Sequence, residues 1–326
     1  MNLIIGRQQN GTVMNNPNNQ AVVEQHTLER KDGLSKSTAT LFTAAMILGT
    51  GLFVSLGATA WDAGSGTLVA IVIGGLICLS TGISAAQVGI NHPVQGGAFI
   101  WMRIFGHPKL SFIAGCVYII EGILGLGIVA LGFATYSAQI FPNLSIPLTA
   151  SLSLIAVATL NILGISPVSK LMIGIFFVVT FFLGVYVILA IPSIEVKNFT
   201  PILGDRIGSV FAGAATFFWT WGGFQRTAIM ASDIREPRTS IPFAIIGGIA
   251  IVTVIFLIVA GVTLGVLGPV VMGSGDVPLY VSAAKVMGIW GAGLILALAT
   301  ISFFSEMLGD LLATSKVQQT MGQVGE

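Results

Sequence analysis

Residues 47–53 read ILGTGLF and stand near the middle of an apolar run that extends over about residues 39–60. A bilayer core needs about 20 apolar residues in a helix, so the run is long enough to cross a membrane. Glycine weakens a helix and lets other groups approach the backbone closely. At membrane depth, non-helical backbone is tolerated only where it is buried in protein or lines a cavity. The stretch therefore predicts either an interrupted helix beside a site or a close packing surface.

The composition extends this membrane assignment to the rest of the chain. Of 326 residues, 54% are hydrophobic and 8% are charged, and the mean hydropathy is +0.93. Soluble domains carry about 25% charged residues. The formal net charge of +1 gives no reason to expect a nucleic-acid partner. Cys78 and Cys116 both lie inside apolar runs, so we expect no disulfide framework.

Apolar runs long enough for membrane helices predict an all-α integral membrane protein with about eight spans. They lie at roughly 39–60, 66–91, 109–140, 147–164, 168–192, 209–231, 241–268 and 288–313. Cytoplasmic loops of membrane proteins are enriched in Lys and Arg. With the amino terminus inside, ten of the 14 Lys and Arg residues are cytoplasmic: Arg7, Arg30, Lys31, Lys36, Arg103, Lys109, Lys170, Arg235, Arg238 and Lys316. We therefore predict a multi-pass protein of a plasma or inner membrane with a cytoplasmic amino terminus.

A second glycine-containing interruption occurs in the sixth run, where residues 219–224 read WTWGGF. The two interruptions are five spans apart, so their helices run in opposite directions, as in an inverted repeat. An unwound segment frees amide N–H groups at one half-helix end and carbonyl groups at the other. These ends match the carboxylate and the ammonium group of an amino acid. Each glycine motif alone is typical of a packing surface, but the two at matching places favour a binding site.

Three further stretches carry a family resemblance. Residues 93–99 read PVQGGAF after the second span, and residues 236–245 read EPRTSIPFAI before the seventh. Residues 311–316 read LLATSK at the end of the eighth span. Together with the two interruptions, their order and spacing resemble the amino acid–polyamine–organocation family of permeases.

The resemblance implies a five-plus-five inverted-repeat transporter fold, which in this family typically has about twelve helices. We expect residues 1–37 to be a disordered cytoplasmic tail and residues 38–192 to be the first five-helix repeat. Residues 193–208 are then an extracytoplasmic loop, and residues 209–326 an incomplete second repeat of three helices. Gln87 and Gln225 stand where many relatives have Glu, so a carboxylate for gating or proton coupling is absent at both positions.

The resemblance also implies a substrate site on the two interruptions. Thr50 and the amides around Gly49 and Gly51 would hold the substrate carboxylate. Tyr118 would lie beside the pocket, and the Trp219 ring would close over the substrate as a gate. The carbonyl groups expected to hold the substrate amino group belong to Ile47, Trp219 and Gly222, with Gly223 next to them.

Ionisable residues inside membrane helices are functional candidates because burying them in a bilayer is costly. Glu121 lies at mid-depth in the third span, one turn from Tyr118, and either receives a cationic group of the substrate or pairs with Arg226. Arg226 either extends to the cytoplasmic interface or takes part in gating or coupling. Glu306 and Asp310 are one turn apart, so one of them is protonated or paired, and Asp310 could also reach the interface.

These features predict secondary active transport of amino acids or related amines by alternating access. The alternative is a truncated relative that does not transport: a fragment, a regulatory subunit or a binding-only receptor. The three histidines lack metal-ligand spacing, and no phosphate-binding glycine loop is present, so we expect no enzyme, cofactor or metal. Expected partners are the lipid bilayer and a small molecule. No coupling ion is assigned, although Ser302 and Ser305 could offer hydroxyl groups to sodium.

Overall fold

A computed structural model describes residues 33–49, 51–203, 207–275 and 277–326. Thr50 and nearly all of the predicted tail lie outside these ranges. The described part is helical apart from loops and one isolated parallel β-bridge between Leu34 and Ile234. The α-helices are α3 (Lys36–Ile47), α4 (Leu56–Ala63), α5 (Thr67–Asn91), α6 (Ala98–Ile104), α7 (Pro108–Ile140), α8 (Ile146–Asn161), α9 (Ile165–Ala190), α10 (Ile207–Phe218), α11 (Phe224–Ile229), α12 (Pro237–Leu267), α13 (Pro269–Gly273) and α14 (Pro278–Gln323).

Each of the eight apolar runs in the sequence contains a helix or a pair of helices. The first run forms α3 and α4, joined through a π-helical turn, η1 (Gly51–Ser55). The sixth run forms α10 and α11, joined through a 3₁₀ turn, η5 (Trp219–Trp221). The other runs form α5, α7, α8, α9, α12 and α14. Both predicted interruptions are therefore confirmed as breaks in α-helical structure.

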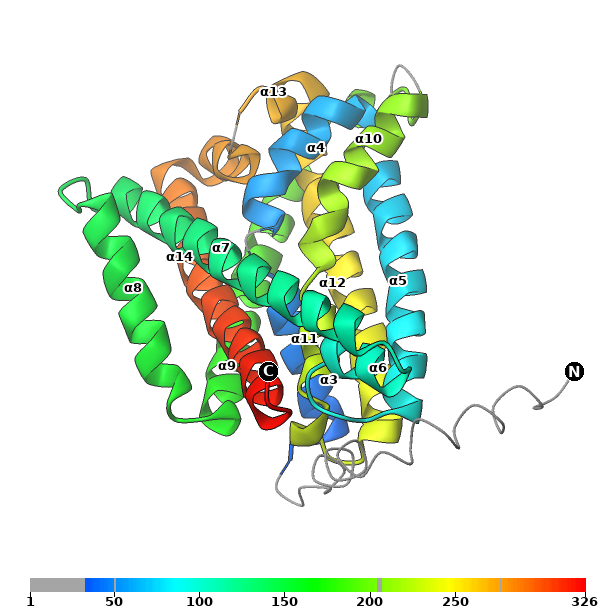
Figure 1. The fold of residues 1–326 in the computed structure, drawn as a ribbon. Coiled ribbons are helices and arrows are strands. Elements are labelled where there is room, and N and C mark those ends of the chain that lie inside the picture. The colour runs from blue at the N-terminus through cyan, green and yellow to red at the C-terminus, as the bar shows by residue number, and fades with distance from the viewer. Residues whose placement is uncertain (1–32, 50, 204–206, 276) are drawn as a thin grey trace, which may run out of the picture.

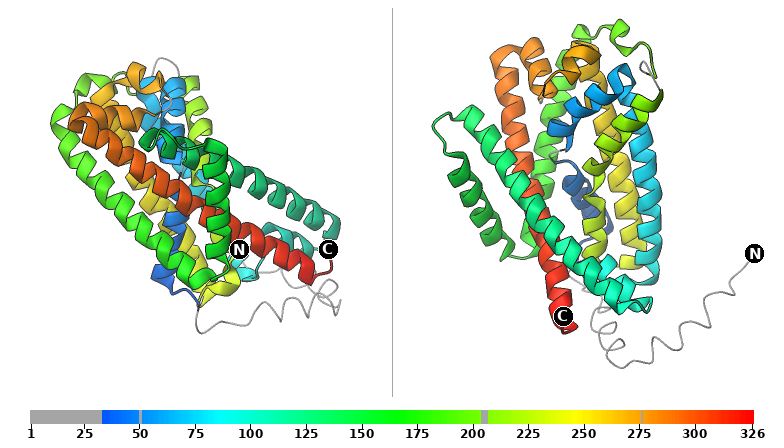
Figure 2. Two further views of the ribbon diagram at one scale, coloured as in Figure 1. Left: turned by 90° about the vertical axis from the view of Figure 1, so that its left-hand side faces the viewer. Right: turned by 45° about the horizontal axis from the view of Figure 1, so that its top comes forward.

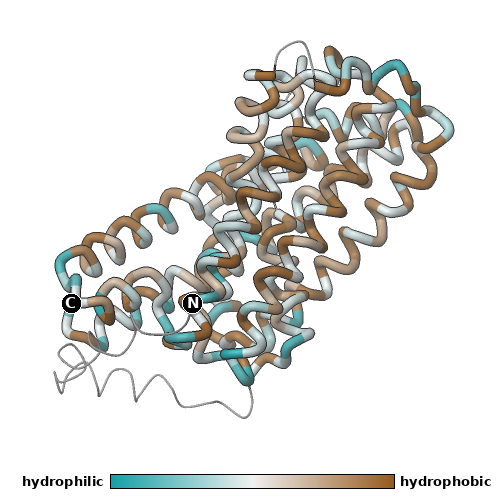
Figure 3. Tube along the Cα trace, turned by 90° about the vertical axis from the view of Figure 1, so that its right-hand side faces the viewer, coloured by the Kyte–Doolittle hydropathy of each residue, from teal (hydrophilic) through white to brown (hydrophobic). Residues whose placement is uncertain are grey.

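Within the described ranges, five helical stretches are long and apolar enough to cross a bilayer: 36–91, α7, 165–193, α12 and α14. The first of these stretches holds two elements, the interrupted α3–α4 and the continuous α5. The 16-residue α8 is apolar but shorter. In Figure 3, hydrophobic segments predominate along the helices, and hydrophilic segments gather mainly at the two ends of the bundle. The chain is an all-α integral membrane protein.

Local sequence explains several helix boundaries. Ser35 caps α3, because its hydroxyl accepts a hydrogen bond from the Thr38 N–H at 3.3 Å. Pro108, Pro237 and Pro278 stand in the first turns of α7, α12 and α14, where proline is favoured. The eighth predicted span, 288–313, is too short: α14 begins ten residues earlier and bends at Gly288, whose φ is 64°. Only glycine adopts this backbone conformation without steric cost.

The helices form one bundle in which α7 crosses obliquely over the others (Figure 1). On one side α14 packs against α7, α8 and α9, and on the other α12 packs against α3 and α5. At the upper end in Figure 1, α4 contacts α13 and α10. The two views in Figure 2 show α3 enclosed by other helices, in agreement with its largely buried residues 39–48. The first interrupted helix thus passes through the middle of the protein.

Candidate functional site

The two helix interruptions meet in space. A Cβ atom added to Gly51 would overlap the side chain of Thr220, and one added to Gly223 would overlap the backbone carbonyl of Met46. Just beyond this junction, the Thr43 and Thr227 hydroxyls share a hydrogen bond of 2.7 Å. The glycines therefore allow close helix contact at the same place where the backbone leaves the α-helical pattern.

Half-helix ends give this junction its backbone polarity. In the first interrupted helix, α3 is the half towards the predicted cytoplasmic end, here called the inner half, and it ends at Ile47. The other half, here called the outer half, begins with η1 at Gly51. α10 ends at Phe218, next to the 3₁₀ turn. Amide groups at a helix start carry partial positive charge, and carbonyl groups at a helix end carry partial negative charge. One junction thus brings an anion-attracting end at Gly51 close to cation-attracting ends at Ile47 and Phe218.

The predicted carbonyl ligands each accept one internal hydrogen bond. The Ile47 carbonyl accepts from the Gly49 N–H at 2.9 Å, and the Trp219 carbonyl accepts from the Gly222 N–H at 2.9 Å. The Gly222 carbonyl accepts from the Gln225 N–H at 3.3 Å. A carbonyl oxygen has two lone pairs, so each retains capacity for a ligand donor. The Gly49 N–H, predicted to hold a carboxylate, is already engaged by the Ile47 carbonyl.

A cavity of about 550 Å³ lies beside this junction. Thr220 and Asp310 belong to its walls. Ile47 and Gly49 do not, and Thr50 lies outside the described residues. The structure brings most of the predicted site residues together around the cavity: Gly51, Tyr118, Glu121, Trp219, Gly222, Gly223, Gln225, Arg226 and Glu306.

The cavity carries more acidic than basic side chains. Arg226 forms an ion pair with Asp310, and their side chains are only 15% and 5% exposed. The guanidinium group is therefore held inside the bundle and does not extend to the interface, and its ion-pair partner on α14 is Asp310. The Glu306 carboxylate lies against the backbone of Gly49, where an added Cβ atom would overlap it. Glu121 is the third carboxylate on the wall, beside a single guanidinium group.

Two side chains at the junction were not identified from the sequence. Ser55 accepts a hydrogen bond from the Trp219 indole N–H at 3.1 Å, so the ring predicted as a gate is tied to η1. Thr220 is buried, and its hydroxyl has no hydrogen-bond partner among the described residues. Leaving a buried polar group unpaired costs about 1–3 kcal/mol. The position of Thr220 inside the WTWGGF stretch could have drawn attention to it, but its lack of a partner is a three-dimensional fact.

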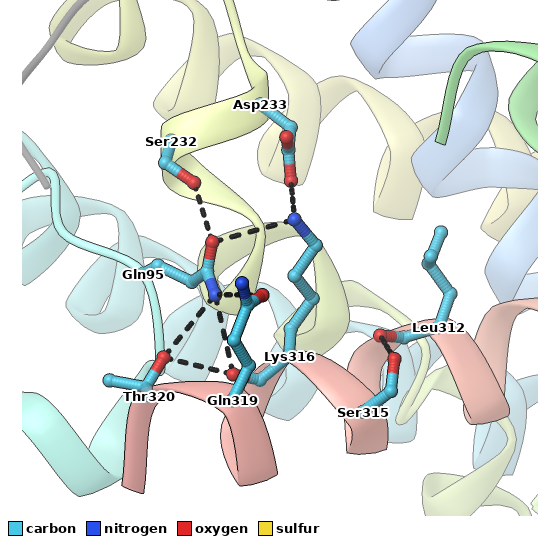
Figure 4. Close-up of polar contacts among 8 residues, drawn as sticks. All are labelled: Gln95, Ser232, Asp233, Leu312, Ser315, Lys316, Gln319 and Thr320. Atoms are coloured by element: carbon cyan, nitrogen blue, oxygen red, sulfur yellow. Dashed lines mark hydrogen bonds and ion pairs between the residues drawn. The ribbon is translucent and has the colours of Figure 1, made fainter. Parts of the chain in front are cut away.

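The three stretches that carried the family resemblance converge at the end of the bundle predicted to be cytoplasmic. Gln95, from the PVQGGAF stretch, donates from Nε2 to Thr320 Oγ1 at 3.3 Å and accepts at Oε1 from Ser232 at 2.8 Å (Figure 4). Lys316, from the LLATSK stretch, forms an ion pair of 2.7 Å with the buried Asp233. Asp233 lies three residues before the EPR stretch. This cluster of Gln95, Ser232, Asp233, Lys316 and Thr320, named here the inner network, joins α14 to the loops after α5 and α11.

A second cavity of about 180 Å³ borders residues next to Gln95 and Lys316 of the inner network. Its walls include Gly96, Gly97 and Val317. The two cavities share the wall residues Ala114, Tyr118, Phe224 and Gln225. Gln225, the predicted gating residue, therefore borders both cavities.

No arrangement of residues in the described ranges suggests a metal centre, since no group of three His, Cys, Asp or Glu side chains could hold an ion. Ser302, considered above for sodium, donates its hydroxyl to the Leu298 carbonyl at 2.7 Å. Its hydroxyl is thus used within α14 as a packing hydrogen bond.

Comparisons with known proteins agree with this architecture. The chain is 25% identical over 308 residues to the branched-chain amino acid permease BcaP of Bacillus subtilis, covering 88% of this chain and 66% of BcaP. It is 23% identical over 316 residues to the methylthioribose transporter of Bacillus subtilis, covering 90% and 67% of the two chains. It is 26% identical over 238 residues to cationic amino acid transporter 5 of Arabidopsis thaliana, covering 67% and 41%. The chain thus spans about two thirds or less of the length of these relatives.

A solved structure shares the fold. The crystal structure of MhsT in complex with L-phenylalanine superimposes with a TM-score of 0.64 at 17% identity, over 88% of this chain and 73% of MhsT. The family profile described as amino acid permease matches residues 34–326, which is nearly all of the described chain. The chain belongs to the amino acid permease family.

Proposed function

We propose that this protein is a secondary transporter that binds an amino acid at the junction of its two interrupted helices. The observation that carries the proposal is the cavity at this junction, bordered by the helix start at Gly51 and by the carbonyl-bearing turn at Trp219 and Gly222. The substrate carboxylate would lie at Gly51, and the substrate ammonium group would lie at the carbonyl groups. The names of the relatives, which include amino acid permeases and a methylthioribose transporter, support transport of small polar molecules.

The charges in the cavity favour substrates with a cationic side chain. Three carboxylates, Glu121, Glu306 and Asp310, line the same cavity as one guanidinium group. Asp310 is neutralised by Arg226. A second positive charge on the substrate would be attracted by this excess of carboxylates over guanidinium groups on the cavity wall. Glu121 is the residue that we assign to this contact.

Alternating access is the mechanism that we propose. The main cavity and the smaller one share the wall residues Tyr118, Phe224 and Gln225. Rearrangement of these shared residues together with the inner network would connect the substrate to the cytoplasmic side. The Trp219 ring would close the opposite side. In this account residues 38–192 and the helices after residue 209 are the two inverted repeats, and the amino terminus is cytoplasmic.

The test is reconstitution of the full chain in liposomes, followed by uptake of a panel of labelled amino acids across pH and sodium gradients. The proposal predicts saturable uptake of at least one amino acid, with cationic amino acids preferred over neutral ones. Saturable binding without uptake would instead identify a binding-only protein. Neither binding nor uptake by correctly inserted protein would refute the proposal.

A further inference from the structure

The hydroxyl group of Thr220 is the buried polar group at the junction whose role is unassigned. Thr220 lies in η5, and only 6% of the residue is exposed. No hydrogen-bond partner for Oγ1 exists among the described residues. Buried polar groups in folded proteins nearly always have a partner, so an exception calls for an explanation.

Several other buried threonines of this protein donate their hydroxyl groups to a backbone carbonyl. Thr43 and Thr59 each donate a hydrogen bond of 2.8 Å to the carbonyl four residues earlier in their helices. Thr263 does the same towards Val259. Thr220 lies where α10 gives way to a 3₁₀ turn, so the regular helical arrangement that supplies this acceptor is lost. The unpartnered hydroxyl of Thr220 thus lies at the helix interruption itself.

The surroundings of Thr220 indicate which ligand group it meets. Its side chain contacts Gly51, the first residue of the outer half-helix, and it lines the main cavity. The N–H groups at the start of that half-helix attract an anion. A neutral hydroxyl at the same place can donate a hydrogen bond to a carboxylate, and such a charge-assisted bond is stronger than one between neutral groups.

We propose that the Thr220 hydroxyl donates a hydrogen bond to the substrate carboxylate and so makes the site select amino acids over amines that lack this group. The inference rests on the proposed transport function and adds a specificity-determining residue to it. A site that holds a polar substrate group with a buried hydroxyl discriminates against analogues without that group, because the hydroxyl is then left unpaired.

The experiment compares lysine with its decarboxylated counterpart, cadaverine, as competitors of labelled lysine uptake in liposomes. Thr220→Val removes the hydroxyl at nearly constant volume, and Thr220→Ser retains it. Thr180→Val is the matched control, since the Thr180 hydroxyl on α9 also lacks a partner among the described residues but does not line the cavity. If Thr220→Val fails to insert, Thr220→Ala removes the same group with less steric demand.

The expected result is that Thr220→Val weakens lysine competition about 10- to 100-fold, the loss associated with one hydrogen bond to a charged group. Cadaverine competition changes less than about 2-fold, and Thr220→Ser and Thr180→Val behave like the unaltered protein. Equal weakening of both competitors, or no weakening of either, would overturn the role of Thr220 while leaving transport intact. Absence of uptake by the unaltered protein would instead refute the transport proposal, and this inference with it.

Discussion

Gly51 lies both at the start of a half-helix and at a close helix contact. It begins the outer half of the first helix, and it contacts Thr220 so closely that a single added methyl group would overlap that side chain. The absence of a side chain at Gly51 therefore allows the close approach of Thr220. This contact gives Gly51 a packing role, and its binding role is part of the proposed function.

Gly51→Ala should reduce amino acid uptake at least about 10-fold, because overpacking a tight junction typically costs about 1–3 kcal/mol and shifts the neighbouring backbone. Uptake per inserted molecule in liposomes is the measurement. Gly174→Ala on α9 is the control, since nothing lies near the position of its Cβ atom. Equal uptake by both variants would show that the junction is not part of the site.

A second prediction for a single residue concerns Glu121 and the selectivity for the substrate side chain. Glu121→Gln should weaken competition by cationic amino acids about 10-fold or more and affect neutral ones little, because a charged contact is lost only for the former. Competition curves with lysine and leucine measure this difference. Glu195→Gln in the loop before α10, exposed and paired with Lys197, is the control. Equal effects on the two substrates would remove Glu121 from side-chain selectivity.

At the scale of helices and loops, the inner network explains why three separate sequence stretches belong together. Gln95, Asp233 and Lys316 come from the loop after α5, the turn after α11 and the end of α14, and they meet in one cluster. The Gly96 N–H adds a bond of 3.1 Å to the Ile229 carbonyl. The network fixes the inner half of the second interrupted helix to α14 at the end opposite to α4 and α13.

Lys316→Met should lower the stability of the purified protein, because removing one partner of a buried ion pair costs about 3 kcal/mol or more. Thermal unfolding in detergent, followed by circular dichroism, measures the effect. Lys197→Met, which removes an exposed pair with Glu195, should leave the unfolding midpoint nearly unchanged. A similar midpoint for both variants would contradict a structural role of the inner network.

The same elements show which features of the fold and of the site can be predicted from the sequence. Glycine pairs within long apolar runs were enough to locate both interruptions, since few residues weaken a membrane helix as strongly. The start of α14 was missed because the polar residues around Lys285 end the apolar run, whereas Lys285 donates to the Val266 carbonyl within the fold. The pairing of Arg226 with Asp310 was one of several open alternatives, because the partner of a charge depends on tertiary contacts. The unpartnered Thr220 hydroxyl has no signature in sequence.

For the whole molecule, the proposed orientation rests on the distribution of positive charge. Arg103, Lys109, Lys170, Arg235, Arg238 and Lys316 lie in loops or at helix ends that alternate with the loop holding Lys197. Because cytoplasmic loops are enriched in Lys and Arg, this distribution supports the proposal that the first group lies inside.

Thiol labelling of single-cysteine variants tests this orientation. In a background with Cys78→Ala and Cys116→Ala, a membrane-impermeant reagent applied to intact cells should label Lys197→Cys and leave Lys170→Cys unmodified. Permeabilised cells should show labelling of both. Labelling of Lys170→Cys alone in intact cells would invert the orientation.

The central claim is that the junction of the two interrupted helices holds both the carboxylate and the ammonium group of an amino acid. Competition by blocked analogues against binding of a labelled amino acid to the purified protein measures it most directly. The account predicts that the N-acetyl and the methyl-ester forms of the same amino acid each compete at least about 10-fold more weakly than the free form. Competition by either blocked form as strong as that of the free amino acid would contradict it.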